Sequence, residues 1–253
     1  MTVDELIKQF QKQYSRAVYD DLVTSAANVK INKGSGSYAD LLSLASKSGK
    51  KSGDILAGLL RGQYGDGDIP ETEAKAILST CLKDNYDFIS ERGELVQNAI
   101  NKKMGVGLKA LRPEYNVDRA EGIGTELATR GAESGYLDTT FKQHVENAVL
   151  SISDDFVKEN ADAHYNAGLE PKIIRIATGR CCDWCAALEG TYSYEDVRET
   201  GNDVFKRHNN CRCIVEYDPG LGTNARQNVH TKKWRNDQDA ATLERRKTAG
   251  LRQ

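Results

Sequence analysis

The sequence predicts a mainly α-helical protein, with an extended helical body over residues 1–170 and a small α+β module, rich in cysteine, over residues 171–220. Apolar residues recur at three- and four-residue intervals along much of the first part, which is the period of an amphipathic helix. Two short β-branched runs follow Pro171, as is typical of strands. Five of the six cysteines lie between Cys181 and Cys213. The change of pattern at Pro171 therefore divides the chain.

A first helix is predicted from Thr2 to about Ala27. Thr2 and Glu5 have the spacing of a capping box, in which each side chain binds a backbone N–H at the start of a helix. The apolar residues that follow at helical spacing are Leu6, Phe10, Tyr14, Ala17 and Val18. Residues 34–37 and 46–53 are rich in glycine and serine, which predicts two loops or hinges on either side of a short helix.

A second long helix is predicted to begin near Pro70, because proline fits the first helical position. Its apolar face is formed by Ala74, Ile77, Leu78 and Leu82. Cys81 lies beside this face, so we expect an inert thiol in the core. The helix is expected to continue to Leu111, with Leu95 and Ile100 directed inward.

The longest uninterrupted helical pattern runs from about Leu137 to Tyr165. Its apolar residues keep a helical period and are Phe141, Val145, Ala148, Ile152 and Phe156. His144 and His164 have no partners at ligand spacing, so we expect ordinary helix residues. Glycine at position 168 then predicts the end of the helix.

The cysteine-rich module is predicted to contain two short strands, Ile173–Ala177 and Cys213–Tyr217, on either side of the cysteines. Residues 188–192 are expected to turn the chain away from them, and Trp184 is expected to pack over the cysteine cluster. Cys181 adjoins Cys182 and should point elsewhere.

Two pairs of residues in this module have the spacing of metal ligands: Cys182 with Cys185, and His208 with Cys211. Two thiolates separated by two residues can reach one ion from a tight turn, and a second pair completes a tetrahedron around zinc. Cys213 competes with His208 for the fourth place, because residues two apart on a strand point the same way. The spacing leaves that choice open.

Other chemistries of the cluster are a set of packed thiols, a disulfide such as Cys182–Cys211, and a nucleophile–base pair between a cysteine and His208. A metal site is favoured, because the cysteines are gathered locally and nothing in the sequence marks a group that would orient His208. A closed site with four protein ligands would stabilise the fold and carry no catalysis.

Charge is unevenly distributed along the chain. The whole chain has a net charge of −2, but residues 221–253 contain eight basic and three acidic residues, a net charge of +5, which leaves −7 elsewhere. We interpret this segment as a basic C-terminal arm that either contacts nucleic acid or an acidic partner, or is simply a solvated terminus. The candidate nucleic-acid-binding residues are Lys232, Lys233, Arg235, Arg245, Arg246 and Lys247.

The sequence contains no run of the roughly 18 apolar residues that a membrane span needs, and its first residues are acidic and polar where a signal peptide would be basic and then apolar. We therefore expect the protein to stay in the compartment where it is made, with no membrane partner.

The order of motifs in the module resembles a known family. Cys182-x-x-Cys185, then Leu188-x-Gly190, then His208-x-x-Cys211-Arg212-Cys213 is similar to the C-terminal signature of the phage Mu F-like minor head proteins, also called phage head morphogenesis proteins. The flanking residues 168–175 and 217–220, with Lys232-Lys233-Trp234, are similar to the version from phages of Gram-positive hosts. The resemblance covers roughly residues 140–235. Lys206-Arg207 stands where many relatives carry proline before the histidine.

This resemblance implies a structural, non-enzymatic virion protein inside the phage head near the portal, made in the bacterial cytoplasm and involved in head assembly, DNA packaging or ejection. Its implied partners are the portal protein and the major capsid protein, with packaged DNA as a further partner of the basic arm. Two alternatives come from other classes: a zinc-ribbon protein that binds nucleic acid, and a hydrolase or transferase with a Cys/His pair.

Overall fold

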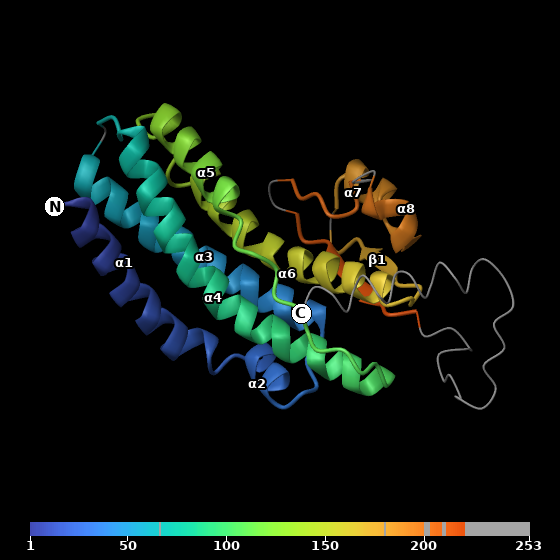
Figure 1. Ribbon diagram of the computed structural model, residues 1–253. Helices are drawn as coiled ribbons and strands as arrows, with labels where there is room; N and C mark the ends of the chain where they lie inside the picture. Colours follow the sequence, from blue (N-terminus) through green and yellow to red (C-terminus); the bar gives the residue numbers. More distant parts are fainter. Residues whose placement is uncertain (66, 180, 200–202, 209–210, 221–253) are drawn as a thin grey trace, which may run out of the picture. The chain divides into compact units, whose positions relative to one another are not determined.

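Helices make up most of the part of the chain that the computed structural model describes, which is residues 1–220 without 66, 180, 200–202, 209 and 210 (Figure 1). A small sheet lies near the C-terminal end of this part, so the predicted fold class is confirmed. The predicted basic arm, with its six candidate nucleic-acid-binding residues, lies outside the described residues. Among the described residues, no helix is both long and apolar enough to cross a membrane.

The chain forms eight α-helices, one π-helical turn and three strands within the described residues. The helical elements are α1 (Val3–Ala17), η1 (Val18–Leu22), α2 (Ala26–Asn32), α3 (Tyr38–Tyr64), α4 (Glu71–Met104), α5 (Val117–Arg130), α6 (Thr140–Asn166), α7 (Asp183–Ala187) and α8 (Tyr194–Arg198). The strands are β1 (Lys172–Ile176), β2 (Gly190–Ser193) and β3 (Ile214–Asp218).

These elements belong to two compact units. The first unit comprises Met1–Val96, Arg112–Ser153 and Arg207–Cys211. The second comprises Gln97–Leu111, Asp154–Lys206 and, among the described residues after these, 212–220. Helices α4 and α6 therefore each contribute residues to both units.

Helix α1 begins with the predicted capping box, in which the Glu5 N–H donates to Thr2 Oγ1 over 3.2 Å and the Thr2 N–H donates to Glu5 Oε2 over 2.8 Å. The prediction of one helix to about Ala27 is wrong, because η1 follows α1 and Ser25 then caps a separate helix, α2. Ser25 Oγ accepts the Asn28 N–H over 3.3 Å. Helices α1 and α2 both pack on α3 (Figure 1).

The first predicted break is confirmed and the second is wrong. Residues 34–37 lie outside the helices, with Gly34 at φ +70° and Ser37 capping α3. Residues 46–53, by contrast, lie in the middle of α3. Their small side chains permit a close approach to α6, since a Cβ on Gly49 would lie 2.8 Å from Glu146 Cα. Tertiary contact thus overrides the weak helix propensity of glycine and serine.

The serines of the same stretch enter a buried polar network that joins three helices. Ser48 Oγ and Ser52 Oγ each donate to Asn85 Oδ1 of α4 over 2.8 Å. Since the Ser48 proton is used in this way, the Tyr14 hydroxyl of α1 donates to Ser48 Oγ over 2.6 Å. Burial raises the pKa of Tyr14, which keeps that proton in place.

Helix α4 begins directly after Pro70, and its predicted apolar face is buried, as is Cys81. Burial raises the pKa of the Cys81 thiol, in keeping with an inert core residue. The predicted continuation to Leu111 is wrong, because α4 ends at Met104. Leu95, predicted to face inward, is 44% exposed, whereas the next residue, Val96, is buried.

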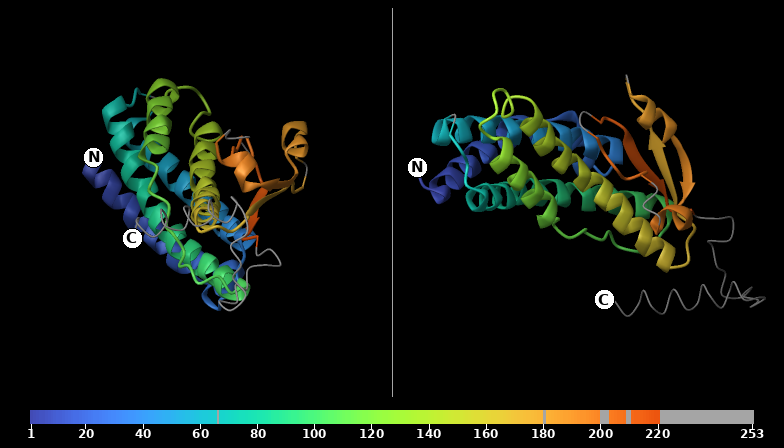
Figure 2. Two further views of the ribbon diagram at one scale, coloured as in Figure 1. Left: turned by 45° about the vertical axis from the view of Figure 1, so that its right-hand side comes forward. Right: turned by 90° about the horizontal axis from the view of Figure 1, so that it is seen from above.

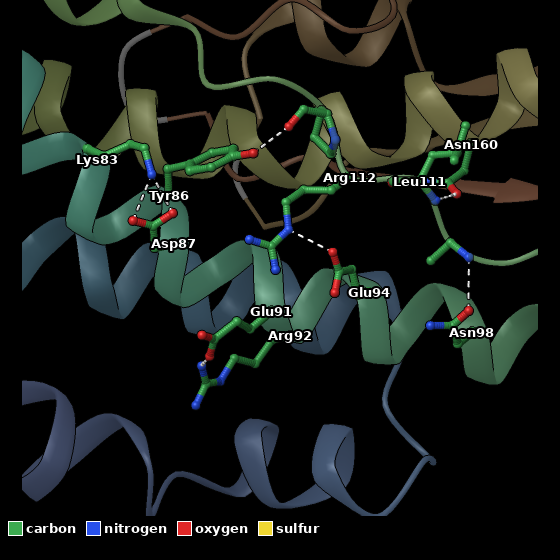
Figure 3. A network of polar contacts seen from close by, with 12 residues as sticks. Lys83, Tyr86, Asp87, Glu91, Arg92, Glu94, Asn98, Leu111, Arg112 and Asn160 are labelled. Carbon is green, nitrogen blue, oxygen red and sulfur yellow. Dashed lines mark hydrogen bonds and ion pairs between the residues drawn. The ribbon is translucent and has the colours of Figure 1, made fainter. Parts of the chain in front are cut away.

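Polar side chains hold the non-helical segment after α4 (Figure 3). In the second unit, Asn160 Oδ1 accepts the Leu111 N–H and its Nδ2 donates to the Leu111 carbonyl, both over 2.8 Å. In the first unit, the Tyr86 hydroxyl donates to the Pro113 carbonyl. These contacts satisfy backbone groups that a longer helix would have paired internally.

Helix α5 is an element that the sequence reasoning did not predict. Asn116 caps it, accepting the Arg119 N–H over 2.8 Å. Gly124 lies against α4, where a Cβ would meet Lys75 Cα at 2.8 Å. Gly124 thus permits a close contact between α5 and α4.

Helix α6 confirms the helix predicted from about Leu137 to Tyr165, and all five residues of its predicted apolar face are buried. It ends at Asn166, and Gly168 lies just beyond as predicted, with φ +86°, while the Leu169 N–H donates to the His164 carbonyl over 3.0 Å. His144 contacts Glu126 of α5, with 3.0 Å between Nδ1 and Oε2.

His164 belongs to a buried polar chain in the second unit. Its Nδ1 lies 3.2 Å from the hydroxyl of Tyr217 on β3, and the same hydroxyl accepts a hydrogen bond from Gln97 Nε2 of α4. Burial lowers the pKa of His164 to about 4, so its imidazole is neutral at pH 7.

The three strands form an antiparallel sheet in the order β2-β1-β3, coloured from gold (β1) to orange-red (β3) in Figure 2. Ile173 at the centre pairs with Tyr192 on one side and Tyr217 on the other. The two predicted strands are confirmed within one residue as β1 and β3. Strand β2 lies where a turn was expected, so the module has one more strand than predicted.

Replacement of Gly49 by alanine is expected to destabilise the protein by about 1–3 kcal/mol, because the added methyl would overlap the α6 backbone. The matched control is Gly58→Ala in the same helix, where a Cβ would meet nothing within 4 Å and alanine should stabilise by about 0.5–1 kcal/mol. Urea unfolding of both variants tests this, and equal shifts of the midpoint would contradict it.

Acid is expected to weaken the second unit through His164. Its folded pKa lies below the unfolded value, so the unfolded chain binds the proton first as the pH falls from 6.5 to about 4. Its contribution is therefore complete above pH 6.5 and is lost through that window. His164→Phe should flatten the pH dependence of the urea midpoint relative to the wild type. Parallel curves for the two proteins would refute this account.

Candidate metal centre

Cys182 and Cys185 lie at the start of the short helix α7. Cys182 is the N-cap residue, with extended backbone (φ −78°, ψ 166°), and Cys185 lies one turn further along. Cys182 is exposed and Cys185 is buried. The N-terminus of a helix suits a negatively charged thiolate, although so short a helix has only a small dipole.

The second group of donors precedes β3. The Cys211 N–H donates to the His208 carbonyl over 3.1 Å, so the backbone groups of these two donors lie close together. Asn147 Nδ2 also donates to the His208 carbonyl, over 3.2 Å. Cys211 and Cys213 are both buried, and the chain enters β3 directly after Cys213.

The structure brings these predicted donors into two overlapping groups. Cys182, Cys185 and His208 form one, and Cys185, Cys211 and Cys213 form the other; within each group the donor atoms lie within 4.8 Å of one another. Sulfur atoms bound to one tetrahedral zinc are roughly 3.8 Å apart, given a Zn–S distance of about 2.3 Å. Each group is therefore close to the dimensions of a metal site.

The five donors can thus hold a metal ion, and Cys185 is common to both groups. A tetrahedral ion takes four ligands, so one of the five is surplus, and the choice between His208 and Cys213 stays as open as the spacing left it. Cys181 is exposed and belongs to neither group, as expected. None of the described cysteines is joined in a disulfide.

Arg175 is a residue of this site that the sequence reasoning missed. It lies on β1 and is 1% exposed, and its Nη2 contacts Cys185 Sγ at 3.9 Å. Trp184, expected to pack over the cysteines, is 38% exposed, and the Arg175 guanidinium lies 5.4 Å from the centre of its ring. The available signal was a charged residue within the apolar run Ile173–Ala177.

The guanidinium of Arg207 lies beside Cys211, a donor of the group that precedes β3. Arg207 Nη1 is 4.0 Å from Cys211 Sγ, and its side chain is half-buried. Hydrogen bonds to metal-bound sulfur are a common means by which proteins orient and tune such ligands. Both contacts are therefore compatible with thiolates that bind a cation.

No model of a known protein family matches this chain, and no curated protein or solved structure matches it either. Four thiols and an imidazole are ligands that soft or borderline ions prefer over magnesium or calcium.

The protein, purified anaerobically in reducing buffer, is expected to hold about one metal ion per chain. Cys182→Ser should lower this content and destabilise the module, because Cys182 belongs to one of the two donor groups. Cys181→Ser is the matched control, since Cys181 is the adjacent exposed thiol outside both groups. Elemental analysis gives the metal content, and less than about 0.2 ion per chain in the wild type would contradict the site.

Proposed function

We propose that this chain is a minor head protein of a bacteriophage, a structural component inside the virion head near the portal. In this role it aids head assembly, DNA packaging or ejection and catalyses no reaction. The proposal includes contacts with the portal protein and the major capsid protein, and synthesis in the bacterial cytoplasm before assembly.

The observation that carries this proposal is the ordered cysteine and histidine signature from Cys182 to Cys213. Its resemblance to the phage head morphogenesis proteins depends on several elements occurring together in order. The same five residues make up the two donor groups described above. A shared role in one site is a physical reason for these residues to occur together.

We propose zinc as the ion, because a mixed thiolate and imidazole set in a small module is typical of structural zinc. Cys185, Cys211 and Cys213 are at most 2% exposed, and burial suits a closed structural site better than a site that must admit a substrate. A catalytic cysteine needs access and a base, and adjacent thiols would compete with it for an electrophile.

The first unit, which contains helices α1 to α3, supplies the surface for partner proteins in this proposal. Of the two hinges expected from sequence, the stretch 46–53 is part of a continuous helix, so adaptation to a symmetric assembly does not come from there. Residues 34–37 remain a break between α2 and α3. Docking through largely preformed helices is therefore favoured over rearrangement within α3.

Mass spectrometry of purified phage particles tests the location directly. The chain should be present in wild-type virions and proheads, at low copy number relative to the major capsid protein. Deletion of its gene should reduce the yield of filled heads or of infectious particles.

Complementation separates the metal centre from the rest of the protein. The Cys182→Ser gene should complement the deletion poorly, and the Cys181→Ser gene should complement it fully. Absence of the chain from virions and proheads, together with normal infectivity of the deletion phage, would overturn the proposal. Salt-dependent DNA binding in that case would favour the zinc-ribbon alternative.

A further inference from the structure

We propose that Arg175 is a positioning residue of the metal centre, which sets the charge around Cys185 and fixes the chain that leads to His208. This inference rests on the metal centre in the proposed function and goes beyond it, since Arg175 is not a ligand. The proposal gives a role to the buried positive charge of Arg175, which the pairing of the strands does not require.

The position of Arg175 is unusual for a charged residue. It lies inside the sheet, paired with Gly190 of β2 and Val215 of β3, and is 1% exposed. Burial of a guanidinium is costly unless anions and acceptors replace the lost water. An apolar residue would fill this strand position at a lower desolvation cost. We therefore explain the guanidinium by its contacts outside the sheet.

Among the described residues, the guanidinium contacts two carbonyl groups and one sulfur atom of the second unit. Its Nη1 donates to the Val204 carbonyl, and its Nη2 donates to the Lys206 carbonyl over 3.1 Å and to Cys185 Sγ at 3.9 Å. The two carbonyls belong to the segment just before His208. A planar fork with several donors can bind all three groups at once, whereas a lysine ammonium is a single point of charge.

The contact between the Arg175 guanidinium and Cys185 Sγ accounts for a positive charge at this position. A metal-bound cysteine is a thiolate, and a guanidinium beside it offsets the negative charge that several thiolates bring into a buried site. A neutral thiol would gain far less from this neighbour. Arg175 therefore balances the negative charge of a metal-bound Cys185, and its contact with Sγ orients that side chain at the same time.

Cobalt(II) is the probe for this proposal, because its thiolate charge-transfer and d–d absorption bands report on the sulfur ligands. Arg175→Met removes the charge and the fork. We expect about 10–100-fold weaker metal binding in chelator competition, and a thiolate-to-cobalt band at longer wavelength, because the sulfur electrons become easier to transfer. Arg175→Lys should keep the band near its wild-type position while binding more weakly than the wild type.

The matched control is Arg198→Met. Arg198 is also in the second unit, where it pairs with Asp162 over 3.2 Å and lies 4.8 Å from the centre of the Tyr165 ring. A general loss of stability would affect both methionine variants, but only Arg175→Met should shift the absorption band. An unmoved band and an affinity equal to that of Arg198→Met would overturn the proposal.

A measurement on the wild type covers the case in which Arg175→Met fails to fold. Protein labelled with nitrogen-15 and loaded with cadmium-113 should show scalar coupling between the metal and an Arg175 guanidinium proton, transmitted through Cys185 Sγ. Absence of this coupling in a loaded wild-type protein would refute the contact. Failure of the wild type to bind cobalt or cadmium would instead refute the metal centre itself.

Discussion

The close approach of α3 to α6 is the contact on which the packing of helices in the first unit depends. Gly49 and Gly53 place no side chain between the two helices, so the backbone of α3 lies almost against Glu146 and Lys142. Helices at this distance gain many small dispersion contacts. Ser46 Oγ adds a hydrogen bond of 2.6 Å to Glu146 Oε1. Because α1 and α2 pack on α3, the position of α3 also sets theirs.

A different constraint governs the small module. Its strands have four or five residues each, and its buried side chains include three cysteines and Arg175 beside a small apolar set, namely Ile173, Tyr194, Val197, Val204, Val215 and Tyr217. Ile173 and Val215 are buried, but so small a sheet has little apolar surface to bury. Ligands bound to one ion would therefore supply cohesion that the core of this module does not.

The sequence predicted the features that depend on local patterns and missed those that depend on distant partners. Helix α6 was identifiable because an uninterrupted 3.6-residue period has few other interpretations. Residues 46–53 were misread, because small polar residues suit a flexible loop and a tight helix contact equally well. Only the contact with α6 distinguishes the two cases.

Leu95 was assigned to the wrong face, since adjacent residues differ by only about 100° around a helix. Spacing identified the five residues of the two donor groups that could hold a metal ion, but the choice of a fourth ligand depends on how two distant segments meet. Arg175 was missed because its partners lie up to 31 residues away.

The buried hydroxyls of α3 also determine which alignment of that helix can exist. Small residues recur every four positions at Ala45, Gly49, Gly53 and Ala57, so shape alone would tolerate a slide of four residues, about 6 Å. Ser48 and Ser52 are the residues of α3 that donate hydrogen bonds to Asn85. The positions one turn before and one turn after them are the buried leucines Leu44 and Leu56. A slide in either direction would set a leucine against the amide of Asn85 and cost that group one of its hydrogen bonds. The polar pair thus selects one register among the several that the four-residue repeat would otherwise allow.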